Sequence, residues 1–300
     1  MTKRISSIVI ALFLALALLT GCSDSDGNDN PQKSFLWEVP SDSGTVYILG
    51  SIHMASQDLY PLNNTIEEAF NRSQYLVVEV DITNINQSEM LQLTEEYGMY
   101  PQGNTLKSAL PVDLYEQVKA RLQKLGIPID LVQSFKPGLI AMTIEELQMS
   151  KYGYKPEYGI DMHFIDKANE SDMDILELES ARFQMEMLGG FSEEIQLLMI
   201  EDTIENTPTE EECQELYEVW GRGDIDAMER LTFESLEGNP DMAPLYEKMI
   251  DDRNSQMAIK IEGYLAESET YFVVVGAGHL VGENGIIDLL IDSGYEPAQL

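Results

Sequence analysis

Three kinds of residue are scarce in this chain, and each scarcity narrows what the protein can be. It has two cysteines, and if Cys22 carries a lipid, Cys213 is left without a partner, so packing rather than a disulfide framework must stabilise the fold. Lysine and arginine number 18 against 53 aspartates and glutamates, which gives a net charge of −35. Such a surface repels phosphates, and we therefore expect no nucleic-acid partner. The chain has only three histidines, so the position of each one is informative.

Two of these histidines lie in the same local pattern near opposite ends of the chain. Residues 45–55 read TVYILGSIHMA and residues 271–282 read YFVVVGAGHLVG, so in both an apolar, strand-like run is followed by G-x-x-H. The glycine allows the chain to turn away from a sheet, and His53 and His279 follow three residues later. Open α/β sheets bind ligands at the carboxyl ends of their strands. The repeated pattern therefore predicts one functional site that contains both histidines.

A carboxylate and a guanidinium are further candidates. Glu79 lies near the end of the apolar run YLVVEV at residues 75–80, where a buried carboxylate needs a partner. It is either a metal ligand or acid/base group, or an outward-facing residue on a strand edge. The strand-like segment DILEL at residues 174–178 also has acids at its end, Glu177 and Glu179. Arg253, ahead of the second histidine strand, either clamps a substrate carbonyl or oxyanion or forms a surface salt bridge with its acidic neighbours.

The third histidine lies in GIDMHF at residues 159–164. One interpretation makes His163 or Asp161 part of a site, as a ligand or as a group that orients one. The other is structural: Asp161 caps a helix or complements its dipole, and His163 is a half-buried histidine with satisfied hydrogen bonds.

Strand and helix patterns alternate after the N-terminal segments. Residues 35–49 predict a β-hairpin, and a helix and a third strand follow as far as residue 80. Helical spacing dominates residues 88–149 and 183–265. We therefore predict one domain over residues 35–300 with an α/β fold, or alternatively α+β: a central mixed sheet with two strand-GxxH units and long helical insertions.

The first 22 residues have the features of a bacterial lipoprotein signal. Two basic residues precede the apolar run IVIALFLALALL at residues 8–19, which is too short to span a membrane comfortably. The run leads into LTGC, which resembles a lipobox, so we expect Cys22 to be lipidated; the alternative is a plain secretory signal. Residues 23–34 predict a flexible acidic tether. We expect a protein held by lipid on the extracytoplasmic face of the cell membrane.

Residues 35–300 together resemble the TraB/GumN family, which includes the Tiki metalloproteases. The matching motifs are LWEV at 36–39, GSIH at 50–53, Val78-Glu79, GIDMH at 159–163, Arg253-Asn254 and GAGH at 276–279. Two GxxH motifs and a glutamate are the signature of the family. The resemblance implies a fold similar to the erythromycin esterase and ChaN-like group and, from the Tiki branch, metal-dependent peptide hydrolysis.

The resemblance implies a peptidase-like hydrolase that acts on a peptide or another small substrate, and the N-terminal signal places it outside the cytoplasm as an expectation. Its catalytic residues would be His53, Glu79, His279 and Arg253. The two histidines and the glutamate would hold a divalent ion, with His163 or Asp161 as a further ligand or a group that orients one. Such donors do not distinguish zinc, manganese and cobalt. A metal-free mechanism would use one histidine as general base, Glu79 to orient it and Arg253 to stabilise the oxyanion.

A second function is compatible with the same residues. A lipid-anchored protein could use this cleft to bind a peptide, a sugar or a metal ion without turnover. Few aromatic residues, 8% of the chain, are available for a dedicated sugar site, which favours the hydrolase.

Overall fold

The computed structural model describes residues 33–300. The predicted signal peptide of residues 1–22, the lipid site at Cys22 and nearly all of the predicted tether lie outside the described residues. Within residues 33–300, no helix combines the length and the apolar character that a membrane span needs.

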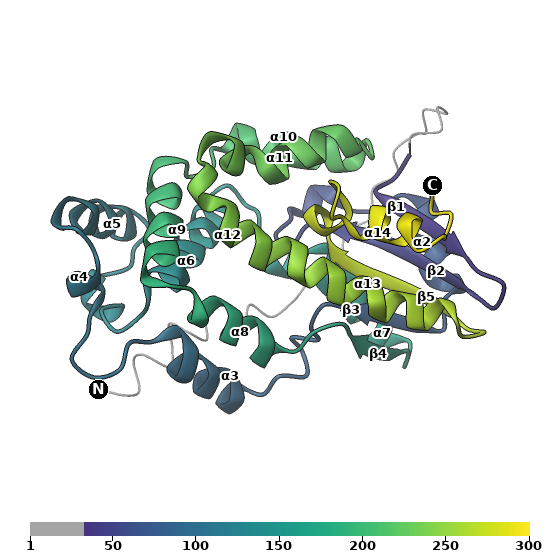
Figure 1. Cartoon of the computed structure of the whole chain (residues 1–300), viewed down its shortest axis with the longest axis horizontal. Helices are drawn as coiled ribbons and strands as arrows, with labels where there is room; N and C mark the ends of the chain where they lie inside the picture. Colours follow the sequence, from purple (N-terminus) through teal and green to yellow (C-terminus); the bar gives the residue numbers. More distant parts are fainter. Residues whose placement is uncertain (1–32) are drawn as a thin grey trace.

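A six-stranded mixed sheet forms the right-hand part of the molecule in Figure 1. Its strands are β1 (Leu36–Pro40), β2 (Thr45–Ser51), β3 (Tyr75–Val78), β4 (Asp174–Glu177), β5 (Thr270–Gly276) and β6 (Ala298–Gln299). Their order across the sheet is β4-β3-β5-β2-β1-β6. Strands β2, β5, β3 and β4 run parallel, and β1 runs antiparallel to both β2 and β6. The predicted α/β fold is thus confirmed, and the two strands that lead to G-x-x-H are hydrogen-bonded neighbours.

Helices make up most of the rest of the described chain. The α-helices are α2 (Asn64–Arg72), α3 (Gln87–Leu93), α4 (Leu106–Ala109), α5 (Val112–Lys124), α6 (Pro137–Lys151), α7 (Ile160–Glu170), α8 (Ala181–Gly190), α9 (Glu193–Glu205), α10 (Glu210–Gly221), α11 (Ile225–Gly238), α12 (Ala243–Tyr246), α13 (Asp252–Leu265) and α14 (Ile286–Asp292). A π-helical turn, η6 (Glu247–Asp251), leads into α13, and a 3-10 turn, η7 (Ala277–Leu280), follows β5.

The connection from β2 to β3 shows how local sequence sets the topology. The side chain of Asn63 accepts a hydrogen bond from the Thr65 N–H and so caps α2. Ile66, Ala69 and Phe70 recur at helical spacing and form the buried stripe of α2. This helix returns the chain from the end of β2 to the start of β3, so both strands end at the same edge of the sheet, with β5 between them.

Helices cover both faces of the sheet. Successive residues of β5 point to opposite sides, and those on both sides are buried. Phe272 packs on one face against Phe70 of α2 and Phe164 of α7, at 5.5 and 4.8 Å between ring centroids. Its neighbour Tyr271 points to the other face and stacks on Tyr264 of α13 at 4.6 Å. In Figure 1, α13 and α14 accordingly lie in front of the sheet, with α2 and α7 behind it.

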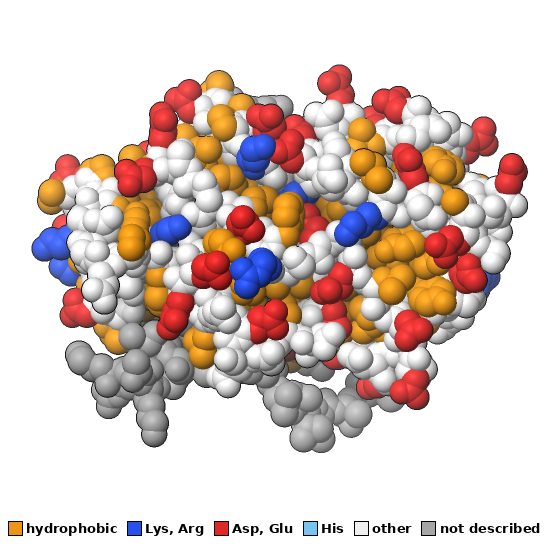
Figure 2. All heavy atoms as spheres, turned by 60° about the horizontal axis from the view of Figure 1, so that its bottom comes forward, with side chains coloured by type: hydrophobic (Ala, Val, Ile, Leu, Met, Phe, Trp, Pro, Cys, Tyr) orange, Lys and Arg blue, Asp and Glu red, His pale blue; other side chains and the backbone are white. Residues whose placement is uncertain are grey.

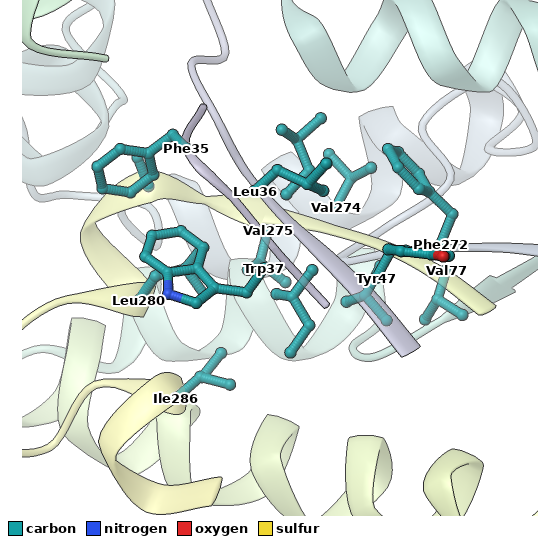
Figure 3. Close-up of a cluster of buried hydrophobic side chains, with 14 of the residues drawn as sticks. Phe35, Leu36, Trp37, Tyr47, Val77, Phe272, Val274, Val275, Leu280 and Ile286 are labelled. Carbon is teal, nitrogen blue, oxygen red and sulfur yellow. The ribbon is translucent and has the colours of Figure 1, made fainter. Parts of the chain in front are cut away.

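The main hydrophobic core fills the space between these layers. Figure 3 shows Trp37, Val275, Leu280 and Ile286 gathered beside the strands, and all four are buried. Burial of an aliphatic or aromatic side chain of this size stabilises the fold by about 1.5–3 kcal/mol. A second cluster belongs to the helical insertions α4, α5, α6 and α9, which form the left half of Figure 1. The predicted helical stretches are therefore confirmed, and the second cluster shows that they bury side chains of their own.

The surface carries the excess of acidic residues. Figure 2 shows aspartate and glutamate side chains spread over the visible face, with fewer lysines and arginines and with apolar side chains between them. This distribution repels anionic ligands and attracts cations.

Candidate functional site

The parallel strands deliver polar side chains to one edge of the sheet. His53 follows β2, Glu79 follows β3, Glu179 follows β4, and His279 lies in the turn η7 directly after β5. Because β2, β5, β3 and β4 are parallel, their carboxyl ends meet at this edge. This is the position at which open α/β sheets bind ligands.

Gly276, the last residue of β5, marks the point where three of these side chains meet. A Cβ atom added to Gly276 would lie 3.4 Å from Glu79 Oε1, from His53 Nε2 and from His279 Cδ2. Atoms that share this distance to one point are separated from one another by at most twice 3.4 Å. The structure therefore brings together the two histidines of the G-x-x-H motifs and the glutamate. The absence of a side chain at Gly276 leaves open the space between them.

His53 is oriented by a carboxylate on α7. Its Nδ1 lies 2.8 Å from Asp161 Oδ2, while Asp161 Oδ1 accepts a hydrogen bond of 2.8 Å from Ser51 Oγ. A carboxylate only accepts, so Nδ1 carries the proton and Nε2 faces the space beside Gly276. The Asp161 charge is the largest effect and raises the pKa of His53, and because the side chain is 64% exposed, solvent moderates this rise.

His279 occupies a different environment. Its side chain is buried, Nδ1 lies 2.6 Å from Asn254 Oδ1, and Nε2 lies 3.9 Å from Glu79 Oε1. Burial, the largest effect, lowers the pKa of His279 to about 4, although the Glu79 charge opposes it. At neutral pH this ring is uncharged, whereas the environment of His53 favours the charged form.

Glu79 is buried but both of its oxygens are occupied. Oε1 accepts the Gly276 N–H at 2.7 Å, and Oε2 accepts from Arg253 Nη2 at 2.5 Å and from Gln184 Nε2 at 3.3 Å. Burial alone would raise the pKa of Glu79, but the charges of His279, which is protonated only in the acid range below about pH 4, of His53 and of Arg253, together with the Gly276 N–H, outweigh it and lower the pKa to about 2. The carboxylate therefore stays ionised.

Arg253 is buried rather than placed in a surface salt bridge. Its Nε and Nη2 donate to the two oxygens of Glu179 at 2.8 Å each, Nη2 also reaches Glu79, and Nη1 donates to the Met249 carbonyl at 3.0 Å. These bonds use four of the five N–H groups of a guanidinium. In this structure Arg253 holds two carboxylates, so its predicted contact with a substrate carbonyl or oxyanion has one N–H left.

Two members of this network were missed by sequence reasoning. Glu179 stood out only as an acid at a strand end, and a pairing partner for Arg253 far along the chain gave no local signal. Gln184 of α8 donates to both Glu179 and Glu79, and nothing in its sequence context distinguishes it from other glutamines on helices.

His163 lies outside the point of convergence. Its Nε2 is 3.2 Å from Glu67 Oε1 on α2, and its ring packs on Tyr60 at 4.7 Å between centroids. Asp161, two residues earlier on another face of α7, reaches His53 instead. Gly159 allows this approach, because a Cβ at that position would lie 2.3 Å from the His53 carbonyl oxygen. Of the predicted additional groups, Asp161 thus contacts a site histidine and His163 does not.

The side chains that meet beside Gly276 carry the types of donor atom that bind a divalent metal ion. Two imidazole Nε2 atoms and a carboxylate are ligands of hydrolytic metal sites, and both Nδ1 atoms are held by acceptors as in known sites. Among residues 33–300, however, no group of three His, Cys, Asp or Glu is placed so that it could hold an ion. An ion would therefore require His53, Glu79 and His279 to draw closer together.

Comparison with known proteins gives the family. Residues 35–299 match the sequence profile of the TraB/PrgY/gumN family. Over 244 residues the chain is 25% identical to the Escherichia coli (strain K12) "Uncharacterized protein YbaP", which covers 81% of this chain and 87% of YbaP. It is 22% identical over 320 residues to the Homo sapiens "Metalloprotease TIKI1", which covers 88% of this chain and 61% of that protein, and 21% identical over 346 residues to its Xenopus tropicalis counterpart, with 95% and 66% covered. No solved structure matches the chain significantly. The profile covers nearly all of the described residues, and the chain belongs to the TraB/PrgY/gumN family.

Proposed function

We propose that this protein is a metal-dependent, peptidase-like hydrolase whose site contains His53, Glu79 and His279. The observation that carries the proposal is the convergence of two imidazoles and one ionised carboxylate on the space beside Gly276. The similarity to proteins named metalloproteases supports a relationship to hydrolases. Zinc, manganese and cobalt all accept this mixture of donors.

The chain would divide the work among its own residues. The Nε2 atoms of His53 and His279 and the Glu79 carboxylate would hold the ion, while Asp161 fixes the orientation of the first histidine. The bound ion would supply Lewis acidity and an activated water near neutral pH. Arg253 keeps Glu79 ionised and in place. The exposed ring of His53 leaves this side of the site open to substrate.

The metal-free mechanism uses the same residues and has its own support. The environments of the two histidines push their pKa values apart, up for His53 and down for His279. Such a pair suits a charged general acid and a neutral general base. Glu79 would then stabilise charge on either ring rather than bind an ion.

We also propose that the protein acts outside the cytoplasm on a peptide or another small substrate and is held at the membrane by lipid on Cys22. The apolar run and lipobox-like sequence before this cysteine support the proposal. Binding of a peptide, a sugar or a metal ion without turnover is the competing function.

The test is an ion-reconstitution assay on the purified chain. The protein is stripped with a chelator, reloaded separately with zinc, manganese or cobalt, and incubated with a mixed peptide library that is analysed by mass spectrometry. We expect cleavage that depends on one of the ions and is lost in His279→Ala but kept in His163→Ala, the matched control outside the site. Ion binding without cleavage in all three reconstitutions would support the binding protein. Equal loss of cleavage in both variants would contradict the assignment of the site.

A further inference from the structure

Asn254 is a fully buried amide that lies between the second histidine and a backbone carbonyl. It is 0% exposed and belongs to the first turn of α13, next to Arg253. Its Oδ1 lies 2.6 Å from His279 Nδ1, and its Nδ2 donates to the Asn284 carbonyl at 2.7 Å. Both ends of the amide are therefore engaged within one short chain of hydrogen bonds.

The partners of this amide determine which way it points. A backbone carbonyl accepts hydrogen bonds and cannot donate them, so the Asn284 oxygen must face the NH₂ group of Asn254. Oδ1 is then left facing His279, and an amide oxygen also only accepts. The proton of a neutral His279 must therefore be on Nδ1. Its Nε2 carries the lone pair and points to the side where Glu79 lies.

We propose that Asn254 is a positioning residue that fixes His279 as the Nδ1–H tautomer and so directs the Nε2 lone pair into the site. The choice of an amide rather than a carboxylate follows from the burial of this histidine. A carboxylate beside a buried imidazole favours its charged form, and a charged ring has no lone pair to offer. A neutral amide sets the tautomer without adding charge.

The contrast with His53 shows that the two histidines are oriented by different means. Asp161, a carboxylate, accepts from the exposed His53, whereas Asn254, an amide, accepts from the buried His279. Both arrangements leave Nε2 unprotonated in the neutral ring. The Asn284 carbonyl also links this orientation to the loop that follows η7, because that loop holds the amide in place.

The experiment reads the tautomer directly in the ion-free, full-length protein by NMR of ¹⁵N-labelled histidine rings. The chain has only three histidines, so the ring signals can be assigned by single substitutions. In the wild-type protein, above the pH at which His279 is charged, we expect Nδ1 of His279 to be protonated and Nε2 to be unprotonated. In Asn254→Leu this preference should be lost, and the ring should populate both tautomers, while the signals of His163 stay unchanged.

A conservative variant separates positioning from simple structural support. Asn254→Asp keeps an oxygen that accepts from His279, so at a pH high enough to keep the ring neutral Nδ1 should remain protonated and Nε2 unprotonated, even if the lost bond to the Asn284 carbonyl lowers the melting temperature. A wild-type ring protonated at Nε2, or an Asn254→Leu ring that keeps the Nδ1–H tautomer, would overturn the proposal. If Asn254→Leu does not fold, the wild-type and Asn254→Asp spectra still decide the question. These readouts need no catalytic turnover, so their failure is distinguishable from failure of the proposed hydrolase function.

Discussion

Gly276→Ala is the substitution that best separates function from stability. The backbone at this position has φ −51° and ψ 135°, which an alanine adopts without strain. The new methyl group would lie 3.4 Å from Glu79 Oε1, His53 Nε2 and His279 Cδ2, distances of van der Waals contact rather than overlap. The chain can therefore accept the methyl group, but the group occupies the space that the three side chains share.

Gly276→Ala should raise the stability of the fold and lower the rate of the reaction. Replacing glycine by alanine at a compatible position stabilises a protein by about 0.4–1 kcal/mol, or roughly 1–4 °C in melting temperature for a chain of this size. An ion in this space would have to lie about 2.0–2.2 Å from its nitrogen and oxygen donors. A methyl carbon needs about 3.5–4.0 Å from its neighbours, so both cannot fit. Displacement by about 1 Å at a reacting centre reduces rates by about 100-fold, and we expect at least this loss.

Thermal melting and the ion-reconstituted peptide assay measure the two effects on the same preparation. Gly50→Ala, in the first G-x-x-H motif, is the matched control, because its Cβ would lie 2.5 Å from Phe35 Cδ1 and 3.1 Å from Ala277 Cα. This overpacking should destabilise the fold by about 1–3 kcal/mol. Full activity in a folded Gly276→Ala protein would refute the argument that the site lies between these three side chains.

The contacts of the site give three further expected outcomes. Burial lowers the pKa of His279 from 6.5 to about 4, so its contribution to stability is complete above pH 6.5 and is lost as the pH falls towards 4. In His279→Asn, the free energy of unfolding measured with urea should therefore change less with pH between 6.5 and 4. The same pH dependence in the variant and the wild type would contradict this role of His279. Glu179→Gln leaves the buried Arg253 paired with Glu79 but weakens its charge-assisted hydrogen bonds to residue 179, and it should lower the free energy of unfolding by about 1.5–3 kcal/mol in the same assay, whereas no loss would mean the pair is solvated. Asp161→Asn removes the charge that raises the pKa of His53, which should therefore fall in an NMR titration; a constant pKa would refute this origin.

The parts of the fold that depend on local pattern could be predicted from the sequence. The hairpin and the two apolar runs before G-x-x-H gave β1, β2 and β5, because strand-like composition and a following glycine are local signals. The place of β5 between β2 and β3 was not predictable in this way. It depends on the pairing of segments more than 190 residues apart, such as Val78 with Val274, and such pairing leaves no local trace.

In the site, too, only the residues marked by a local pattern could be predicted from the sequence. His53, Glu79 and His279 could be named because each follows a recognisable strand, and parallel strands share a carboxyl edge. The partners that set their chemistry came from elsewhere. Asn254 and Gln184 lie on helices whose apolar spacing says which face is buried but not which polar side chain meets which. Hydrogen bonds between such residues are fixed by packing of whole layers, which sequence spacing does not record.

The charges buried at this edge connect the two proposed mechanisms. Glu79 and Glu179 are negative and Arg253 is positive, so this buried group retains one net negative charge. An uncompensated charge away from water is unfavourable, and the group therefore favours a second cation nearby. A proton on His53 meets this need when no ion is bound, which is why the Glu79 charge helps to raise the pKa of that ring. A divalent ion would meet it instead, but only through an Nε2 atom without a proton. Proton and ion thus compete for one nitrogen, and the same buried charge favours both.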